Sequence, residues 1–154
     1  MIGLCATEGG RLPFADYAKR LQCLAETVHR WLSALAGLDD KRRQRVAGYA
    51  DRVAATLKRA TAALGALQSA PTDRAAREQA IRELGRIAGY IETMVGALDH
   101  HLDGRKLAGV KRRLEQLQPA ELHRCVVSGR RPEQIERLAS AEGYFRALAD
   151  GLRA

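Results

Sequence analysis

The sequence predicts an all-α fold, an antiparallel helical bundle of three long helices with two or three shorter helices toward the C-terminus. Apolar residues recur every seven positions in three consecutive segments, a spacing typical of helices that pack on one another. No β-branched run alternates with polar residues, so no strand is expected. Because 154 residues suffice for one compact core, we expect an irregular segment over 1–12 and a single helical-bundle domain over 13–154.

The first long helix is expected from Pro13 to Ala36. Proline suits the first turn of a helix because its missing N–H has no intrahelical partner there. Gly37 suits the position just beyond the helix end, and the connection that follows is short, so the first two helices are expected to be antiparallel neighbours. The apolar positions seven apart are Phe14, Leu21, Val28 and Leu35, and those between them are Tyr17, Ala18, Leu24, Ala25, Trp31 and Leu32.

The second long helix is expected to begin after Asp39 and Asp40, because a carboxylate can accept from the free N–H groups of a first helical turn. Its many small residues permit close approach of neighbouring helices. The apolar positions seven apart are Val46, Val53, Ala60 and Leu67, and those between them are Tyr49, Ala50, Thr56, Leu57, Ala63 and Leu64.

A third long helix is expected with Thr72 as its N-cap and Gly104 at its end. Beyond it we expect a fourth helix that Pro119 ends or kinks and a last helix that Pro132 starts, with Gly143 weakening its middle. The expected core residues are Ile81, Leu84, Ile87, Ala88, Ile91, Met94, Val95, Leu98 and Leu102 in the third helix, and Ile135, Leu138, Ala139, Tyr144, Phe145, Leu148 and Leu152 in the last.

Composition limits the compartment and the class of partner. The chain carries 26 Lys and Arg against 18 Asp and Glu, a net charge of +8, which favours contact with a polyanion, although a merely solvated basic surface would give the same count. No apolar stretch is long enough to span a membrane and no secretory signal is evident, so we expect a cytoplasmic protein. Cys5, Cys23 and Cys125 are far apart and are expected to be reduced thiols.

The strongest local signal is a basic cluster on the second helix, where the stretch from Lys41 to Arg59 contains seven basic residues and a single acidic one, Asp51. Arg45, Arg52 and Arg59 are seven apart, so they form one row along the helix with about 10 Å between successive Cα atoms. Phosphates of a nucleic-acid backbone could meet such a row, and the binding would weaken steeply with salt and carry no sequence specificity. The expected binding residues here are Lys41, Arg42, Arg43, Arg45, Arg52, Lys58 and Arg59.

A second basic cluster surrounds the shorter helices and their turns. Arginines at turns can fork onto phosphates or carboxylates. The alternative is that they pair with glutamates on neighbouring turns, which contributes only a few tenths of a kcal/mol per pair. The binding residues expected from this cluster are Lys111, Arg112, Arg113, Arg130 and Arg131.

No arrangement of residues indicates an enzyme or a metal centre. Glu26 and His29 have the Glu-x-x-His spacing of di-iron carboxylate bundles, but such a site needs two of these motifs and further inward glutamates. No serine lies in a G-x-S-x-G context, and no glycine-rich phosphate loop follows a strand. We therefore expect no catalytic residue, no metal and no cofactor.

Two stretches carry a resemblance to a known family. Val127-Ser128-Gly129-Arg130 follows an apolar helix, and Gly143-Tyr144-Phe145-Arg146-Ala147-Leu148 lies near the end of the sequence. Together they resemble the end of the small all-helical subunits of CRISPR effector ribonucleoprotein complexes. The resemblance implies a protein that stacks with copies of itself along a guide–target filament and grips phosphates without cutting them.

The leading hypothesis is a non-catalytic helical bundle that binds nucleic acid, RNA or a ribonucleoprotein above all, through backbone phosphates. Aromatic residues make up 5% of the chain, which argues against base stacking and for recognition of the backbone or of A-form shape. The alternative is an adaptor or assembly protein whose apolar stripes pair with a second copy or with an acidic helical partner. The hypothesis of a helix that lies on a membrane surface has less support still, because the basic stretches have no bulky apolar side opposite their cations.

Overall fold

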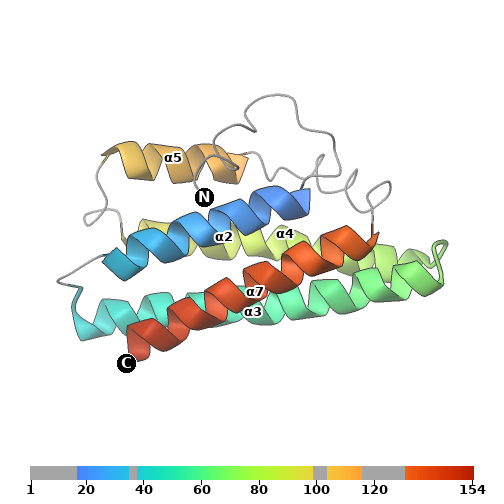
Figure 1. The fold of residues 1–154 in the computed structure, drawn as a ribbon, viewed down its shortest axis with the longest axis horizontal. Helices are drawn as coiled ribbons and strands as arrows, with labels where there is room; N and C mark the ends of the chain where they lie inside the picture. The colour runs from blue at the N-terminus through green and yellow to red at the C-terminus, as the bar shows by residue number, and fades with distance from the viewer. Residues whose placement is uncertain (1–16, 35–37, 99–103, 116–130) are drawn as a thin grey trace.

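The computed structural model describes residues 17–34, 38–98, 104–115 and 131–154, and these residues form helices and their connecting turns (Figure 1). The expected all-α class is confirmed over this part of the chain. The segment 1–12, the start at Pro13 and the turn at Pro119 lie outside the described residues. The described helices are α2 (Tyr17–Ala34), α3 (Asp40–Ser69), α4 (Arg74–Gly96), α5 (Gly104–Glu115) and α7 (Arg131–Arg153).

Helix α3 packs against α4 on one side and against α7 on the other, while α2 packs chiefly on α7 and α5 lies on α2 and α4 (Figure 1). Contacts between the start of α3 and the end of α7 show that these two helices are antiparallel. Helices α2 and α7 are parallel, because Gln22 contacts Ser140 and His29 contacts Tyr144 further along both. Helix α2 is thus antiparallel to α3 as expected, but the expectation that the two are neighbours is wrong, because α2 packs chiefly on α7, a helix more than a hundred residues away.

The apolar stripe of α3 lies in the core along its whole length. Its positions seven apart, Val46, Val53, Ala60 and Leu67, are all buried. Alanines fill much of the remaining contact surface, which lets α4 and α7 approach closely on either side. The other buried residues of this helix are Ala47, Ala50, Ala54, Thr56, Leu57, Ala63 and Leu64.

The helix boundaries confirm some expectations and correct others. Asp39 caps α3 by accepting the N–H of Arg42 at 2.8 Å. The expected cap Thr72 is wrong, because Asp73 takes this role in α4 and accepts the N–H of Ala76 at 3.2 Å. Gly104 does not end the third long helix, since α4 stops at Gly96 and Gly104 begins α5.

Helix α7 is longer than the sequence suggested for a C-terminal helix. It has 23 residues, as many as α4, and Pro132 lies in its first turn as expected. Phe145 is 1% exposed in the core, whereas Ala139, expected to be buried, is exposed. The stretch 143–148 that carries the family resemblance lies within α7, and the stretch 127–130 lies outside the described residues.

Two further findings concern the cysteines and the membrane. Cys23 on α2 is disulfide-bonded, so the expectation of a reduced thiol is wrong at this position. None of the helices described above combines the length and the apolar character that a membrane crossing requires.

Candidate functional site

Four of the residues expected to bind phosphate share one side of α3. Lys41 and Arg45 are one turn apart, and Arg52 and Arg59 follow at intervals of seven, which keeps all four near one line of the helix surface. All four are exposed. Between Lys41 and Arg59 the row extends for about 27 Å at 1.5 Å per residue.

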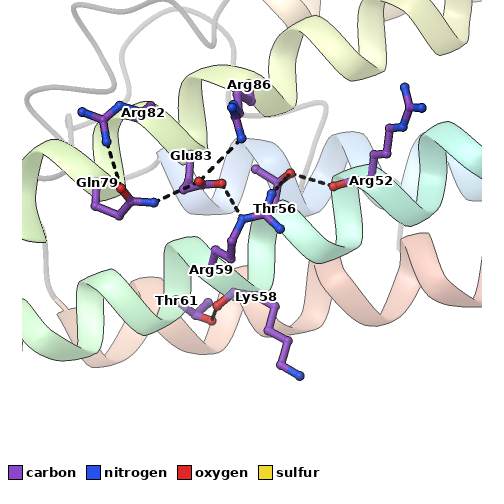
Figure 2. Close-up of polar contacts among 9 residues, drawn as sticks. All are labelled: Arg52, Thr56, Lys58, Arg59, Thr61, Gln79, Arg82, Glu83 and Arg86. Carbon is purple, nitrogen blue, oxygen red and sulfur yellow. Dashed lines mark hydrogen bonds and ion pairs between the residues drawn. The ribbon is translucent and has the colours of Figure 1, made fainter.

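Helix α4 adds two arginines to the same side. Arg82 and Arg86 flank Glu83 on α4, and Glu83 reaches across to Arg59 on α3 (Figure 2). The Arg59 Nε lies 2.9 Å from Glu83 Oε2. The cations of α3 and the two arginines of α4 therefore lie on either side of the line along which the two helices meet, which we call the seam. We call this surface the α3–α4 basic face, made of Lys41, Arg45, Arg52, Arg59, Arg82 and Arg86.

The seam is held by a continuous hydrogen-bond network around Glu83, whose side chain is only 4% exposed (Figure 2). Gln79 donates its Nε2–H to Glu83 Oε1 at 3.0 Å, and an Nη of Arg86 lies 3.8 Å from the same oxygen. Arg59 also donates through Nη2 to the Thr56 hydroxyl at 3.1 Å. The buried carboxylate therefore has partners on both of its oxygens, as a buried charge requires.

Two tyrosines lie in the seam, and their rings are already occupied. Tyr49 and Tyr90 are half-buried and pack on each other with centroids 6.4 Å apart at an interplanar angle of 45°. The guanidinium carbon of Arg52 lies 5.2 Å from the centroid of the Tyr49 ring, a cation–π contact. The basic face therefore presents cations to the solvent and keeps its aromatic rings engaged.

The charge of the basic face is largely uncompensated within the described residues. Glu83 is the one carboxylate that contacts its cations, and Lys41 and Arg45 make no ion pair with any described residue. The acid of the basic stretch of α3, Asp51, pairs instead with Arg153 of α7. Six cations and one buried carboxylate on a single surface produce a strongly positive potential there.

The remaining residues expected on α3 lie elsewhere. Arg43 is half-buried and donates its Nε–H to the carbonyl oxygen of Leu152 at 3.1 Å, a contact between helices. Arg42 is half-buried beside the Asp39 cap. The Lys58 side chain is exposed but extends in the opposite direction from Arg52 (Figure 2).

The second expected cluster does not extend the row on α3. Lys111 and Arg112 are exposed on α5, a helix that packs on α2 and α4. The side chains of Arg113 and Arg131, and the whole of Arg130, lie outside what the structure describes.

Glu26 and His29 form no metal site with other described residues. His29 packs edge-to-face on Tyr144, with ring centroids 5.7 Å apart at 66°. No group of three or more His, Cys, Asp or Glu side chains suited to a metal occurs in the described part of the chain. The rings border a shallow hollow of about 320 Å³ whose other lining residues are Ser140, Gly143 and Ala147.

Sequence reasoning missed Arg82, Glu83 and Arg86, although one signal was present. Glu83 falls on the apolar stripe of α4, between the buried residues Ala80 and Ile87. A carboxylate at such a position indicates a buried ion pair, because an unpaired buried charge is too costly. The identity of its partner depended on how α3 and α4 align, which the spacing does not give.

Comparison with known proteins returned no match: no family model, no curated protein and no solved structure is similar to this chain. The functional argument therefore rests on the geometry and charge of the chain itself. The expected kinship with small CRISPR subunits gains no support from these comparisons.

Proposed function

We propose that this protein binds nucleic acid without catalysis and that the α3–α4 basic face holds the sugar–phosphate backbone. The observation that carries the proposal is the gathering of six cations from two packed helices on one surface, where the carboxylate that contacts them among the described residues is buried. Lys and Arg that neutralise phosphates release condensed counterions, which supplies most of non-specific nucleic-acid affinity.

A duplex, RNA above all, suits this face better than a single strand. Proteins that hold single strands without sequence preference stack bases on open aromatic rings. Here Tyr49 and Tyr90 pack on each other, and Arg52 lies near the Tyr49 ring. Duplex RNA is instead recognised by its shape and by contacts to its phosphates and 2′-hydroxyls, which exposed cations on rigid helices can make.

The described residues expose little apolar surface through which an adaptor protein, the alternative function, could dock. No Val, Leu, Ile, Met, Phe, Tyr or Trp is exposed among the side chains that the structure describes. Apolar docking sites are contiguous exposed patches, and the stripes of these helices are buried against one another instead. The basic face would also attract an acidic protein partner.

A role as a ribonucleoprotein subunit is the extension of this proposal that the resemblance of 143–148 suggests. Such a subunit would hold backbone phosphates while copies of it stack along the nucleic acid. Sedimentation of the protein alone and with RNA duplexes of increasing length tests this extension. Assembly whose size grows with duplex length supports stacking, whereas one copy per duplex at every length contradicts it.

The proposal is tested by binding to labelled single-stranded RNA, duplex RNA and duplex DNA at about 50 and 200 mM salt. The test variant reverses two charges on the basic face, Arg45→Glu with Arg52→Glu. The matched control also reverses two exposed cations: Arg30→Glu on α2, a helix that packs chiefly on α7, and Lys58→Glu, whose side chain extends in the opposite direction from Arg52 (Figure 2). The two variants therefore have the same net charge.

We expect the test variant to lose about tenfold or more in affinity for every sequence and to show a flatter salt dependence. The control variant should lose much less affinity. Equal losses in the two variants would show that only net charge matters and would remove the face from the proposal. No binding by the unmodified protein at low salt would reject nucleic-acid binding altogether.

A further inference from the structure

Arg59 is the cation of the basic face whose orientation is most fixed. Its Nε–H donates to Glu83 at 2.9 Å and one Nη2–H donates to the Thr56 hydroxyl at 3.1 Å. A guanidinium has five N–H groups, so three remain for a ligand. The side chain is 49% exposed, so these remaining donors are accessible from the solvent.

Arg86 approaches the same carboxylate from α4. One of its Nη atoms lies 3.8 Å from Glu83 Oε1, and its side chain is 52% exposed. Two half-exposed guanidinium groups thus flank a single buried carboxylate, which leaves one net positive charge at this point. Paired guanidinium groups are well suited to the oxygens of one phosphate.

The partners of Arg59 are themselves fixed. Gln79 donates to Glu83 at 3.0 Å, and Thr56 donates its hydroxyl hydrogen to the carbonyl oxygen of Arg52 at 2.7 Å. A side chain held in place before binding loses less conformational entropy when a ligand arrives. Lys41 and Arg45 have no such supports among the described residues and must be ordered by the ligand.

We propose, building on the nucleic-acid function above, that Arg59 and Arg86 form one phosphate subsite and that Glu83 is its positioning residue. Glu83 does not touch the phosphate; it holds the two guanidinium groups so that their outer N–H groups point to solvent. This role predicts that removing Glu83 changes the affinity for a polyanion in the opposite direction from the simple loss of a negative charge. Removing an acid from a basic face should tighten polyanion binding, whereas removing the positioning residue weakens it.

The test compares Glu83→Leu, which keeps the buried volume, with Glu78→Gln, which removes an exposed acid of the same helix. Both changes raise the net charge by one. Affinity for a labelled RNA duplex of about 20 base pairs is measured by fluorescence anisotropy over a range of salt concentrations. We expect Glu83→Leu to bind about fivefold more weakly with a salt slope lower by about one, and Glu78→Gln to bind as the unmodified protein or slightly more tightly.

A second pair of variants keeps the ion pair and guards against a folding defect in Glu83→Leu. Thr56→Val removes the hydroxyl that holds Nη2 of Arg59, while Thr61→Val removes a comparable hydroxyl that donates to the Lys58 carbonyl oxygen. We expect about twofold weaker binding for Thr56→Val only, with thermal unfolding recorded for all four variants.

The outcomes separate the subsite from the function it rests on. Binding by the unmodified protein, together with equal or tighter binding by folded Glu83→Leu and no loss in Thr56→Val, would overturn the subsite and leave the nucleic-acid function standing. Absence of binding by the unmodified protein would overturn both.

Discussion

The Nε–H of Arg43 donates to the carbonyl oxygen of Leu152 at 3.1 Å and so joins the beginning of α3 to the end of α7. The last carbonyl groups of a helix have no intrahelical partner, and a positive charge beside them is favourable. One residue further on, Arg153 forms an ion pair with Asp51 of α3 at 2.6 Å. Two arginine contacts therefore hold the C-terminal end of α7 on α3.

Arg43→Ala should lower the free energy of unfolding by about 1 to 2 kcal/mol, since it removes a charged donor from a half-buried interhelical contact. Urea unfolding followed by far-UV circular dichroism measures the change. Arg45→Ala is the control, because Arg45 is exposed and makes no ion pair with any residue that the structure describes, and it should change stability by less than about 0.5 kcal/mol. For RNA binding we expect the reverse order. Weaker binding by Arg43→Ala than by Arg45→Ala would contradict this division of roles.

Asp73→Ala should destabilise the protein by about 1 kcal/mol, because the Asp73 carboxylate accepts the N–H of Ala76 in the first turn of α4. Thr72→Ala, one residue earlier, should have an effect below about 0.5 kcal/mol. Thermal and urea unfolding of the two variants decide between the caps. A larger loss of stability for Thr72→Ala than for Asp73→Ala would show that Thr72 is the N-cap of α4, as the sequence predicted.

Gly143→Ala should stabilise the protein by up to about 1 kcal/mol. Glycine in a helix interior is less favourable than alanine by about this amount, and a Cβ at Gly143 would meet no heavy atom within 4 Å. Gly89→Ala on α4 is a second case with the same open surroundings. Denaturant unfolding measures both changes. A loss of stability in Gly143→Ala would mean that the hollow beside His29 requires a residue without a side chain at position 143.

Phe145→Ala should cost about 3 to 5 kcal/mol, a large fraction of the about 5 to 15 kcal/mol that stabilises a typical domain. Phe145 is 1% exposed and is among the largest fully buried side chains described. Ala147→Ser, two residues away on the exposed side of α7, should change stability by less than about 0.5 kcal/mol. Chemical denaturation tests this pair. Similar small effects at both positions would show that α7 contributes little to the core.

Burial along each helix could be predicted well from the sequence. Val46, Val53, Ala60 and Leu67 are all buried as expected, because a helix returns to the same direction about every seven residues. The exception Ala139 is instructive. Alanine is small enough to lie on either side of a helix at little cost, so its position carries little information.

The candidate site could be predicted only in part. The row of Lys41, Arg45, Arg52 and Arg59 follows from spacing within one helix. That Arg59 meets Glu83 of another helix, and that Arg43 meets Leu152, depends on how far each helix is shifted along its neighbour. The sequence spacing gives no value for that shift.

The sequence by itself determined the all-α class, the apolar stripes and the excess of positive charge on α3. The tertiary structure alone decided that α2 packs chiefly on α7, and that Arg43 and Arg59 are engaged in contacts between helices. The physical reason is that the hydrophobic effect is non-directional: it requires an apolar stripe to be covered but does not specify the covering helix. Polar contacts between helices are set only after that choice, by the register of the packed pair.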